Sequence, residues 1–381
     1  MDKLLIQGGQ SLSGSVKISG AKNSVLPMLC ASVMPATGVV QLENVPHLQD
    51  VTTTTRLLTQ MGVSVTMDEF MNISLDPSAI DNFYAPYDLV KTMRSSILVL
   101  GPLLSRFGEA KVSLPGGCAI GLRPVDMHLK ALKKMGAEIK VERGYITAQS
   151  KRLKGANITF EKKTVTGTEN IIMAASLAKG LTKINNAANE PEISDLCLFL
   201  NKMGAKISGH GTDMIEIDGV EVLRGTIHKP LPDRIEAGTF MIAAAITRGD
   251  VEINNIVPNH SFAVIEKLIE AGAEITSNDN SIRVKMRQRP KAVDIETNAY
   301  PFFPTDMQAQ MTALNAVAKG DSYVRENIFE NRFMHVQELE RMGASIKVED
   351  NTATISGTKK LLAAPVMATD LRASASLILA G

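Results

Sequence analysis

Two patterns of hydrophobic and polar positions alternate along the chain, and the first joins a helix to a strand through a glycine. Apolar residues before each glycine follow helical spacing, whereas those after it alternate as in a strand. Glycine tolerates the left-handed backbone angles that commonly end a helix. The copies, about 70 residues apart, are LLTQMGVSVT, LKKMGAEIKV, LNKMGAKISG, LIEAGAEITS and LERMGASIKV, with their glycines at Gly62, Gly136, Gly204, Gly272 and Gly343.

The second pattern is a helix rich in Ala, Leu and Met that ends at a glycine and is followed by a strand. Its copies end at Gly38, Gly108, Gly180, Gly249 and Gly320. These helices are apolar nearly all round, so we expect them inside the protein with sheets packed around them. A sixth copy, DLRASASLILAG, reaches Gly381, where the other copies continue into a strand and a second helix. We therefore expect the sixth unit to be incomplete and a C-terminal segment to be missing.

Together the patterns predict six repeated units, each with two helices and several strands. The fold class is therefore α/β, with three units in each of two lobes. The proline pair in Pro230-Leu231-Pro232, between the third and fourth units, is the best internal boundary.

Composition narrows the class of protein further. With 381 residues, 44% of them hydrophobic and 21% charged, the chain can form a large core and two domains. The formal net charge of +1 gives no sign of a polyanionic partner. The three cysteines lie far apart and form no disulfide framework, which favours a reducing, cytoplasmic setting. No apolar run is long enough for a signal peptide or a membrane span.

The residues that lead into the Ala-rich helices carry unusual charge. A helix N-terminus attracts anions, so a basic residue there, placed against the local preference, indicates an external anionic ligand. Capping by Asn23, Ser95 or Asp306 is the structural alternative. Asp306 and Asp370 could be plain N-caps, the more common role of acids at such positions, or one could be a general base if they face the same cleft as the basic groups. The six sites contain Lys22 and Asn23, Lys91 and Arg94, Glu169 and Asn170, Asp233 to Glu236, Asp306, and Asp370 with Arg372.

The stretch LPGGCAIGLRPVDMH places Cys118 directly after two glycines, in a loop rather than a core position. A thiol there can act as a proton donor or, beside a cation such as Arg123, as a thiolate nucleophile. Cys30 and Cys197 lie inside apolar helices and are expected to be inert. His128 is interpreted as part of the polar face of the next helix.

The sequence contains no motif for a metal site or for a glycine-rich phosphate-binding loop. The six histidines show no paired ligand spacing, and CxxC, HExxH, Walker and GxGxxG motifs are missing. We therefore predict neither a metal nor a cofactor.

Six motifs together resemble the UDP-N-acetylglucosamine 1-carboxyvinyltransferase family of enolpyruvyl transferases over essentially the whole chain: SGAKNS, LPGGCAIGLRPVDMH, PDRIEAGT, FPTDMQAQ, ENIFENRFMH and TDLRAS. The resemblance implies two inside-out α/β barrel domains. The first would span 22–232 and carry the Cys118 loop; the second would combine 1–21 with 233–381 and contain the incomplete unit.

The resemblance also implies a reaction and its residues. The family transfers the enolpyruvyl group of phosphoenolpyruvate to the 3′-hydroxyl of UDP-N-acetylglucosamine and releases phosphate, opening peptidoglycan synthesis. Cys118, which the antibiotic fosfomycin alkylates in the family, would protonate the enol carbon or form an adduct; Asp306 would be the candidate base and Lys22 a further catalytic residue. Phosphoenolpyruvate would contact Lys22, Asn23, Arg123, Asp370 and Arg372. The nucleotide sugar would contact Arg94, Arg123, Pro124, Val125, Asp126, Met127, Lys163, Gly167, Asp306 and Ile328.

Two other hypotheses remain open at this point. Enolpyruvyl transfer to shikimate 3-phosphate uses the same fold, but its site has no comparable cysteine loop. A repeat-built clamp on nucleic acid is the non-enzymatic alternative. The near-neutral charge and an aromatic content of 4% with no tryptophan argue against that clamp.

Overall fold

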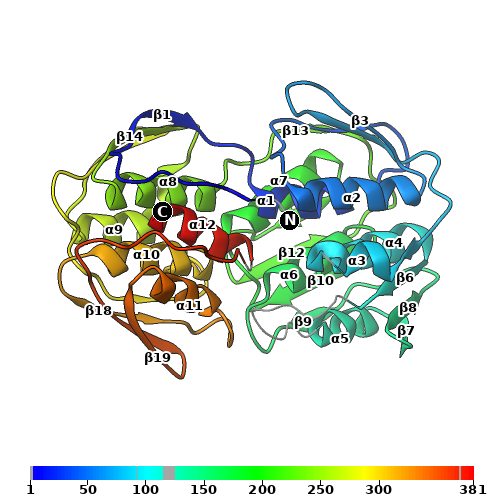
Figure 1. Ribbon diagram of the computed structural model, residues 1–381. Helices are drawn as coiled ribbons and strands as arrows, with labels where there is room; N and C mark the ends of the chain where they lie inside the picture. The colour runs from blue at the N-terminus through cyan, green and yellow to red at the C-terminus, as the bar shows by residue number, and fades with distance from the viewer. Residues whose placement is uncertain (1–2, 92, 115–124, 369) are drawn as a thin grey trace. The chain divides into compact units, whose positions relative to one another are not determined.

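The computed structural model describes residues 3–91, 93–114, 125–368 and 370–381 (Figure 1). Its helices are α1 (Lys22–Ala31), α2 (Gln49–Gln60), α3 (Tyr87–Val90), η1 (Arg94–Val99), α4 (Leu100–Phe107), α5 (Asp126–Lys134), α6 (Val165–Ser176), α7 (Pro191–Lys202), α8 (Arg234–Ile246), η2 (Pro258–Ser261), α9 (Phe262–Glu270), η3 (Thr305–Met307), α10 (Gln308–Val317), α11 (Met334–Arg341) and α12 (Leu371–Ala380), where η marks a 3-10 helix.

The strands of the described residues form five four-stranded sheets with one shared topology. In each sheet the first two strands are parallel and the remaining neighbours are antiparallel. The strand orders are β1 (Ser13–Lys17)-β14 (Asp250–Asn254)-β16 (Ser281–Lys285)-β15 (Glu274–Ser277); β13 (Ile227–His228)-β2 (Val40–Leu42)-β4 (Ile73–Asp76)-β3 (Ser64–Met67); β5 (Tyr84–Ala85)-β6 (Glu109–Ser113)-β8 (Tyr145–Gln149)-β7 (Glu138–Glu142); β9 (Asn157–Thr159)-β10 (Leu181–Asn185)-β12 (Met214–Asp218)-β11 (Lys206–Ser208); and β17 (Ile295–Glu296)-β18 (Asp321–Arg325)-β20 (Thr352–Ser356)-β19 (Ser345–Glu349).

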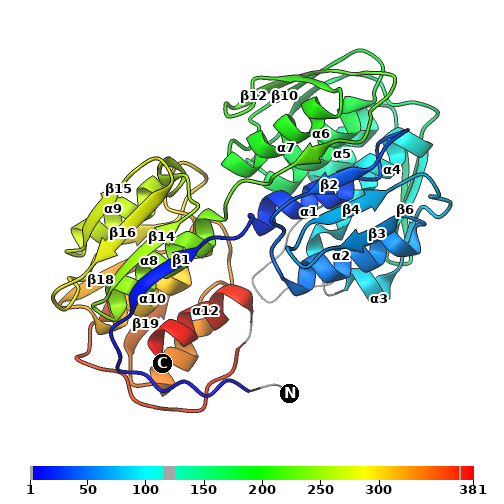
Figure 2. The same ribbon diagram turned by 90° about the horizontal axis from the view of Figure 1, so that it is seen from above.

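Two of these sheets recruit their first strand from a distant part of the chain. Strand β1 pairs with β14, so that Ser13 lies opposite Asp250, and Figure 2 shows the two strands side by side. In the same way β13 pairs with β2, and Ile227 lies opposite Gln41. A parallel partner cannot come from a tight hairpin, so each such pairing requires a long connection. Because β1 precedes and β14 follows the unit that contains β2 and β13, the chain passes twice between two compact units.

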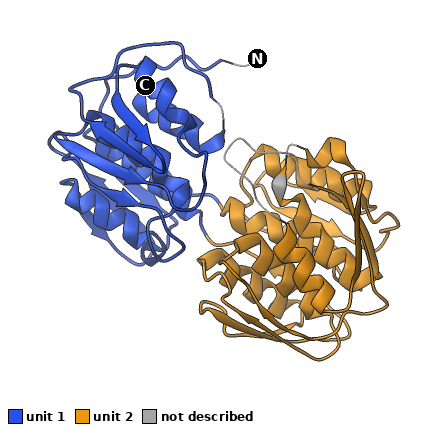
Figure 3. Cartoon of the chain, turned by 90° about the horizontal axis from the view of Figure 1, so that it is seen from below, with its two compact units in different colours: residues 1–19, 118–122, 232–381 blue, residues 20–117, 123–231 orange. Residues whose placement is uncertain are grey.

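The chain forms two compact units (Figure 3), and each has its own hydrophobic core. Among the described residues, one unit contains those up to Ser19 and those from Pro232 onward, and the other contains those from Gly20 to Leu231. The first unit encloses α8, α10 and α12, and the second encloses α1, α4 and α6. In the described residues, five copies of the repeat thus include a sheet, and the sixth is represented by α12.

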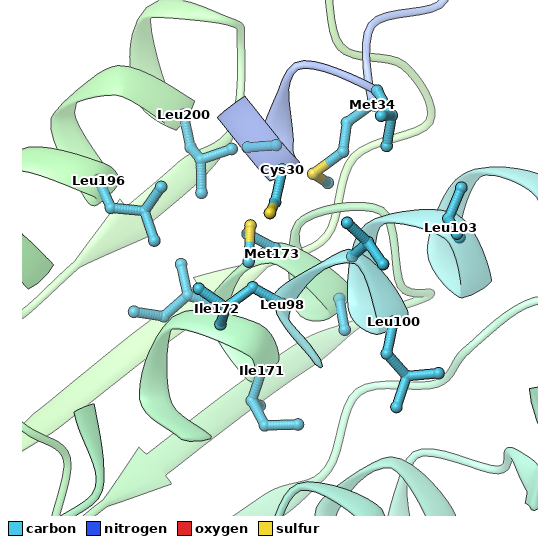
Figure 4. Close-up of a cluster of buried hydrophobic side chains, with 14 of the residues drawn as sticks. Cys30, Met34, Leu98, Leu100, Leu103, Ile171, Ile172, Met173, Leu196 and Leu200 are labelled. Atoms are coloured by element: carbon cyan, nitrogen blue, oxygen red, sulfur yellow. The ribbon is translucent and has the colours of Figure 1, made fainter. Parts of the chain in front are cut away.

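Burial confirms that the Ala-rich helices form the interior. All residues of α6 from Gly167 to Ser176 are buried, as are those of α10 from Gln308 to Ala316. Figure 4 shows Cys30 of α1 among the side chains of the second unit's core, beside Met173. Cys30 and Cys197 are both free and buried, and burial raises the pKa of each thiol well above its usual value. The prediction that these two cysteines are inert is consistent with that environment.

The glycines that end the helices have left-handed backbone angles at nine of the ten predicted positions. The exception is Gly249: the left-handed residue there is Arg248, with φ 54°. A Cβ atom on Gly249 would lie 2.2 Å from the carbonyl oxygen of Leu12. Close approach of the β1 segment, rather than a left-handed angle, therefore requires glycine at that position.

Within the described ranges, every helix is too short or too polar to cross a lipid bilayer.

Candidate active site

Asp306 lies in η3, immediately before α10, and its carboxylate is held between two arginines of the same unit. Nη2 of Arg332 donates to Oδ1 at 2.7 Å, and Nη2 of Arg372 donates to Oδ2 at 2.8 Å. The Asp306 side chain caps neither η3 nor α10. The interpretation of Asp306 as a plain N-cap is therefore wrong, because both carboxylate oxygens face guanidinium groups instead of helix N–H groups.

The two arginines determine the charge of Asp306. Burial alone would raise the pKa of this carboxyl group, but the charges of Arg372 and Arg332 outweigh burial and lower the pKa well below its usual value. Burial would likewise lower the pKa of Arg372, yet Asp306 and Asp233 raise it. Asp306 is consequently ionised and, in this arrangement, a weak base.

A chain of buried polar groups connects Asp306 to the segment that contains Ile328. Nη1 of Arg332 donates to Oγ1 of Thr305 at 2.9 Å, and that hydroxyl donates to Oε2 of Glu326 at 2.9 Å. The other oxygen of Glu326 accepts from the backbone N–H of Ile328 at 2.9 Å. Arg332 and Glu326 are only 5% and 2% exposed, so the chain is shielded from water. Ile328 itself is exposed, and its backbone N–H is tied to Asp306 through this chain.

Sequence reasoning missed Arg332 and Glu326, although both lie in the motif ENIFENRFMH. The available signal was a charged pair on either side of Phe329, but spacing alone does not show that Arg332 points toward Asp306.

Asp370 has a different role from Asp306. It is the N-cap of α12, and its Oδ1 accepts from the backbone N–H groups of Arg372 at 2.9 Å and Ala373 at 3.2 Å. The N-cap alternative is therefore correct at Asp370. The cap fixes the first turn of α12, from which Arg372 reaches Asp306.

Lys22 and Asn23 open α1 in the other unit. Ala21 is the N-cap, no side chain caps the helix, and its first turn contains no acidic residue. The capping role considered for Asn23 is therefore wrong, and so is that for Ser95, which lies within η1. Nζ of Lys22 lies 2.5 Å from Oδ2 of Asp50, an ion pair that sequence reasoning also missed because α1 and α2 meet only in the folded chain.

The segments expected to contact the nucleotide sugar start two neighbouring helices of this second unit. Val125 is the N-cap of α5, with Asp126 and Met127 in its first turn. Thr164 is the N-cap of α6, and its Oγ1 accepts from the backbone N–H of Gly167 at 3.2 Å. Nζ of Lys163 donates to Oδ1 of Asn189 at 3.1 Å.

One expected helix start is misplaced. Glu169 and Asn170 lie inside α6 rather than leading into it, because the helix already begins at Val165. Glu169 is buried, and its burial, together with nearby Glu192 and Glu190, raises its pKa well above the usual value. It is therefore an interior group and not an anion-binding position.

Several predicted residues lie outside the described part of the chain. These are Cys118, Arg123 and Pro124, together with the side chain of Arg94, whose backbone begins η1. Within the described residues, no group of three or more His, Cys, Asp and Glu side chains is arranged to hold a metal ion.

The sequence of this chain is similar to those of known enolpyruvyl transferases. The EPSP synthase (3-phosphoshikimate 1-carboxyvinyltransferase) family matches residues 6–381. A UDP-N-acetylglucosamine 1-carboxyvinyltransferase of Hydrogenovibrio crunogenus (strain DSM 25203 / XCL-2) is 61% identical, over 100% of this chain and 91% of that protein. One of the same name from Coxiella burnetii (strain Dugway 5J108-111) is 59% identical, over 100% of this chain and 88% of its own length.

Solved structures agree on the fold. The enolpyruvyl transferase NikO from Streptomyces tendae superposes with a TM-score of 0.85 at 23% identity, covering 98% of this chain and 89% of NikO. EPSP synthase from Acinetobacter baumannii gives a TM-score of 0.74 at 21% identity, over 98% and 90% of the two chains. The two-unit α/β fold is thus shared, and the sequence identities show that the chain belongs to the UDP-N-acetylglucosamine 1-carboxyvinyltransferases, within the EPSP synthase family of enolpyruvyl transferases.

Proposed function

We propose that the protein transfers the enolpyruvyl group of phosphoenolpyruvate to the 3′-hydroxyl of UDP-N-acetylglucosamine and releases phosphate. The names of relatives up to 61% identical support the choice of substrates. The observation that carries the chemistry is the ionised carboxylate of Asp306 between Arg332 and Arg372. Phosphoenolpyruvate is an anion that guanidinium groups bind well, and a sugar hydroxyl needs a base when it attacks carbon.

The reaction has two balanced halves. In the first, the sugar oxygen bonds to C2 of phosphoenolpyruvate, its proton leaves, and C3 gains a proton. In the second, C3 loses a proton, the C2–O bond to phosphate breaks, and inorganic phosphate departs. A carboxylate on the side of the hydroxyl and an acid on the side of C3 meet the demands of the first half. We assign these roles to Asp306 and Cys118.

Asp306 can act as a base only if its contacts with arginine weaken. Because two guanidinium groups hold the pKa of this carboxyl group low, loss of either would raise the pKa and make the oxygen a better proton acceptor. Arg372 is the candidate to move, since it is also the proposed ligand of the phosphoenolpyruvate anion, whereas Arg332 is 5% exposed and also bonded to Thr305. Binding of phosphoenolpyruvate would then activate Asp306 by drawing Arg372 away.

The remaining assignments follow the resemblance. Lys22, Asn23, Arg123, Asp370 and Arg372 would form the phosphoenolpyruvate site. The nucleotide-sugar site would consist of Arg94, Arg123, Pro124, Val125, Asp126, Met127, Lys163, Gly167, Asp306 and Ile328. The unit with α1 and α6 would be the first enolpyruvyl transferase domain, spanning 22–232, and 1–21 with 233–381 would form the second. Alkylation of Cys118 by fosfomycin and a cytoplasmic location remain predictions.

The test is phosphate release from phosphoenolpyruvate by the purified protein, measured with UDP-N-acetylglucosamine, with shikimate 3-phosphate and with neither. Release that depends on the nucleotide sugar supports the proposal. Release only with shikimate 3-phosphate would assign the other enolpyruvyl transfer, and no acceptor-dependent release would overturn the proposed function.

A further inference from the structure

Asn170 is a fully buried amide in α6 that bonds to three other helical segments of the same unit. Its Oδ1 accepts from the backbone N–H of Gly101 in α4 at 2.8 Å. Its Nδ2 donates to the carbonyl oxygen of Ile97 in η1 at 3.1 Å and lies 3.0 Å from Nδ1 of His128 in α5. Asn170 is 0% exposed and His128 is 3% exposed. One amide thus joins η1, α4 and α5 to α6.

The backbone partners fix the orientation of this amide. The N–H of Gly101 can only donate and the carbonyl of Ile97 can only accept, so the oxygen and nitrogen of Asn170 cannot be exchanged without losing both bonds. Nδ1 of His128 must then accept a hydrogen bond from Nδ2 of Asn170, which leaves the imidazole proton on Nε2. That nitrogen lies 3.4 Å from Oγ1 of Thr166. His128 is therefore held in one tautomer between Asn170 and the first turn of α6.

The imidazole is also neutral. Burial lowers the pKa of His128 to about 4, and the carboxylate of Asp126 opposes this effect only in part. An amide and an imidazole buried in this interior would be costly if they were not bonded. Apolar residues could fill the same volume, so the polar pair is best explained by the particular arrangement that it enforces.

The elements joined by this pair carry the residues proposed to bind the nucleotide sugar. Segment η1 begins at Arg94, α5 begins at Asp126 after Val125, and the first turn of α6 contains Gly167. Thr166, which faces His128, immediately precedes Gly167. A displacement of α5 against α6 would therefore change the distances between these groups.

We propose that Asn170 and His128 are positioning residues that hold three nucleotide-sugar-binding segments in register, without contacting the substrate. The proposal rests on the proposed function, because that function assigns the segments to UDP-N-acetylglucosamine. It extends that function by giving a role to His128, which follows the RPVDM motif, and to Asn170 of the GTENI motif. The sequence alone did not indicate this role for either residue.

The test compares His128→Leu, which removes both bonds, with His128→Asn, whose amide oxygen can still accept from Asn170 but cannot reach Thr166. Leu200→Ala in α7 is the control, since it removes buried volume from the same core but leaves the Asn170–His128 and Thr166–His128 bonds in place. Steady-state kinetics give the KM for each substrate, and calorimetry gives the Kd for UDP-N-acetylglucosamine. Thermal unfolding verifies that each variant is folded.

We expect His128→Leu to raise the KM and Kd for UDP-N-acetylglucosamine about ten-fold, with a KM for phosphoenolpyruvate within about two-fold of the original. For His128→Asn, both constants for UDP-N-acetylglucosamine should lie between those of the unmodified protein and those of His128→Leu. Leu200→Ala should change neither constant. An unchanged Kd in folded His128→Leu, or an equal rise in Leu200→Ala, would overturn the proposal. If the unmodified protein binds UDP-N-acetylglucosamine but releases no phosphate, the proposed reaction fails and the Kd comparison still decides the positioning role. If it does not bind the nucleotide sugar, both proposals fail.

A spectroscopic measurement tests the geometry separately. The ¹⁵N shifts of His128 should show a neutral imidazole protonated at Nε2 from pH 8 to about 5. A mixture of tautomers, or protonation at Nδ1, would contradict the hydrogen bond from Asn170.

Discussion

Arg332 donates from Nη2 to Oδ1 of Asp306 at 2.7 Å, and this buried ion pair joins the segment after β18 to the start of α10. The arginine side chain is 5% exposed, whereas that of Asp306 is 24% exposed. The arginine is therefore the anchored partner, and the carboxylate is the one that can reach solvent or substrate.

Replacement of Arg332 tests this anchoring. Arg332→Met leaves one oxygen of a partly buried carboxylate without its cation, so we expect a loss of about 3 kcal/mol in the free energy of unfolding. The pKa of Asp306 should rise, which would move the acidic limb of the pH profile of kcat toward higher pH. Denaturant unfolding and pH-dependent kinetics measure the two effects.

Arg341→Met is the matched control for that variant, because Arg341 lies in the neighbouring helix α11, is itself exposed and pairs with Glu338. Its stability should change by less than about 1 kcal/mol. Equal losses in the two variants would contradict the anchoring role of Arg332.

The low pKa of Asp306 predicts how its contribution to stability depends on pH. A carboxyl group whose pKa is lower in the folded state stabilises the protein fully above its unfolded value, near 3.9, and loses that contribution as pH falls toward the folded value. The difference in unfolding free energy between the unmodified protein and Asp306→Asn should be constant from pH 7 to about 4.5 and shrink below about pH 4. Urea unfolding across this range measures it. A difference that shrinks already between pH 7 and 5 would show that Asp306 has an ordinary or raised pKa.

The lowered pKa of His128 predicts that stability also depends on pH in a higher range than that set by Asp306. Its pKa is lowered from 6.5 to about 4, so the unfolded chain binds the proton more readily and stability falls as pH drops through this interval. The slope due to this one group reaches at most about 1.4 kcal/mol per pH unit. His128→Asn should remove that part of the slope between pH 6.5 and 4. An unchanged slope in urea unfolding would mean that His128 is not buried as a neutral base.

The close contact between Gly167 and Thr164 predicts that substitutions at these two positions are coupled. A Cβ atom added to Gly167 would lie 2.4 Å from Cγ2 of Thr164, so Gly167→Ala should disturb the cap and cost about 1 to 2 kcal/mol in unfolding free energy. Thr164→Ser keeps the capping hydroxyl and removes the methyl group. The double variant should therefore recover much of the loss, as measured by a double-mutant cycle of unfolding free energies. Simple additivity would contradict the clash.

We expect the three cysteines to differ in their reactivity toward thiol reagents. Cys30 and Cys197 are buried with raised pKa values, so in the native protein a thiol reagent should modify Cys118 alone, and all three only after unfolding. Mass spectrometry after brief treatment with fosfomycin should find the adduct on Cys118 and none on Cys118→Ser. An adduct on Cys30 would contradict both the burial and the proposed role of the loop.

Local chemistry made much of this protein predictable from its sequence. The recurring glycines and the two hydrophobic periods indicated six α/β units, and the apolar faces of helices such as α6 placed them inside, because helical spacing and apolar surface are properties of short segments. The motif around Cys118 and the charged starts of α1 and α12 indicated an anion-binding enzyme for the same reason.

Only the tertiary structure decided which polar groups meet. Asp306 and Asp370 looked alike as acids before a helix, yet one lies between two arginines and the other caps α12. Likewise, no local pattern pairs Asn170 with His128, which lies in another helix. Hydrogen bonds and ion pairs depend on distances of about 3 Å between groups far apart in the chain, and those distances exist only once the helices and sheets have packed.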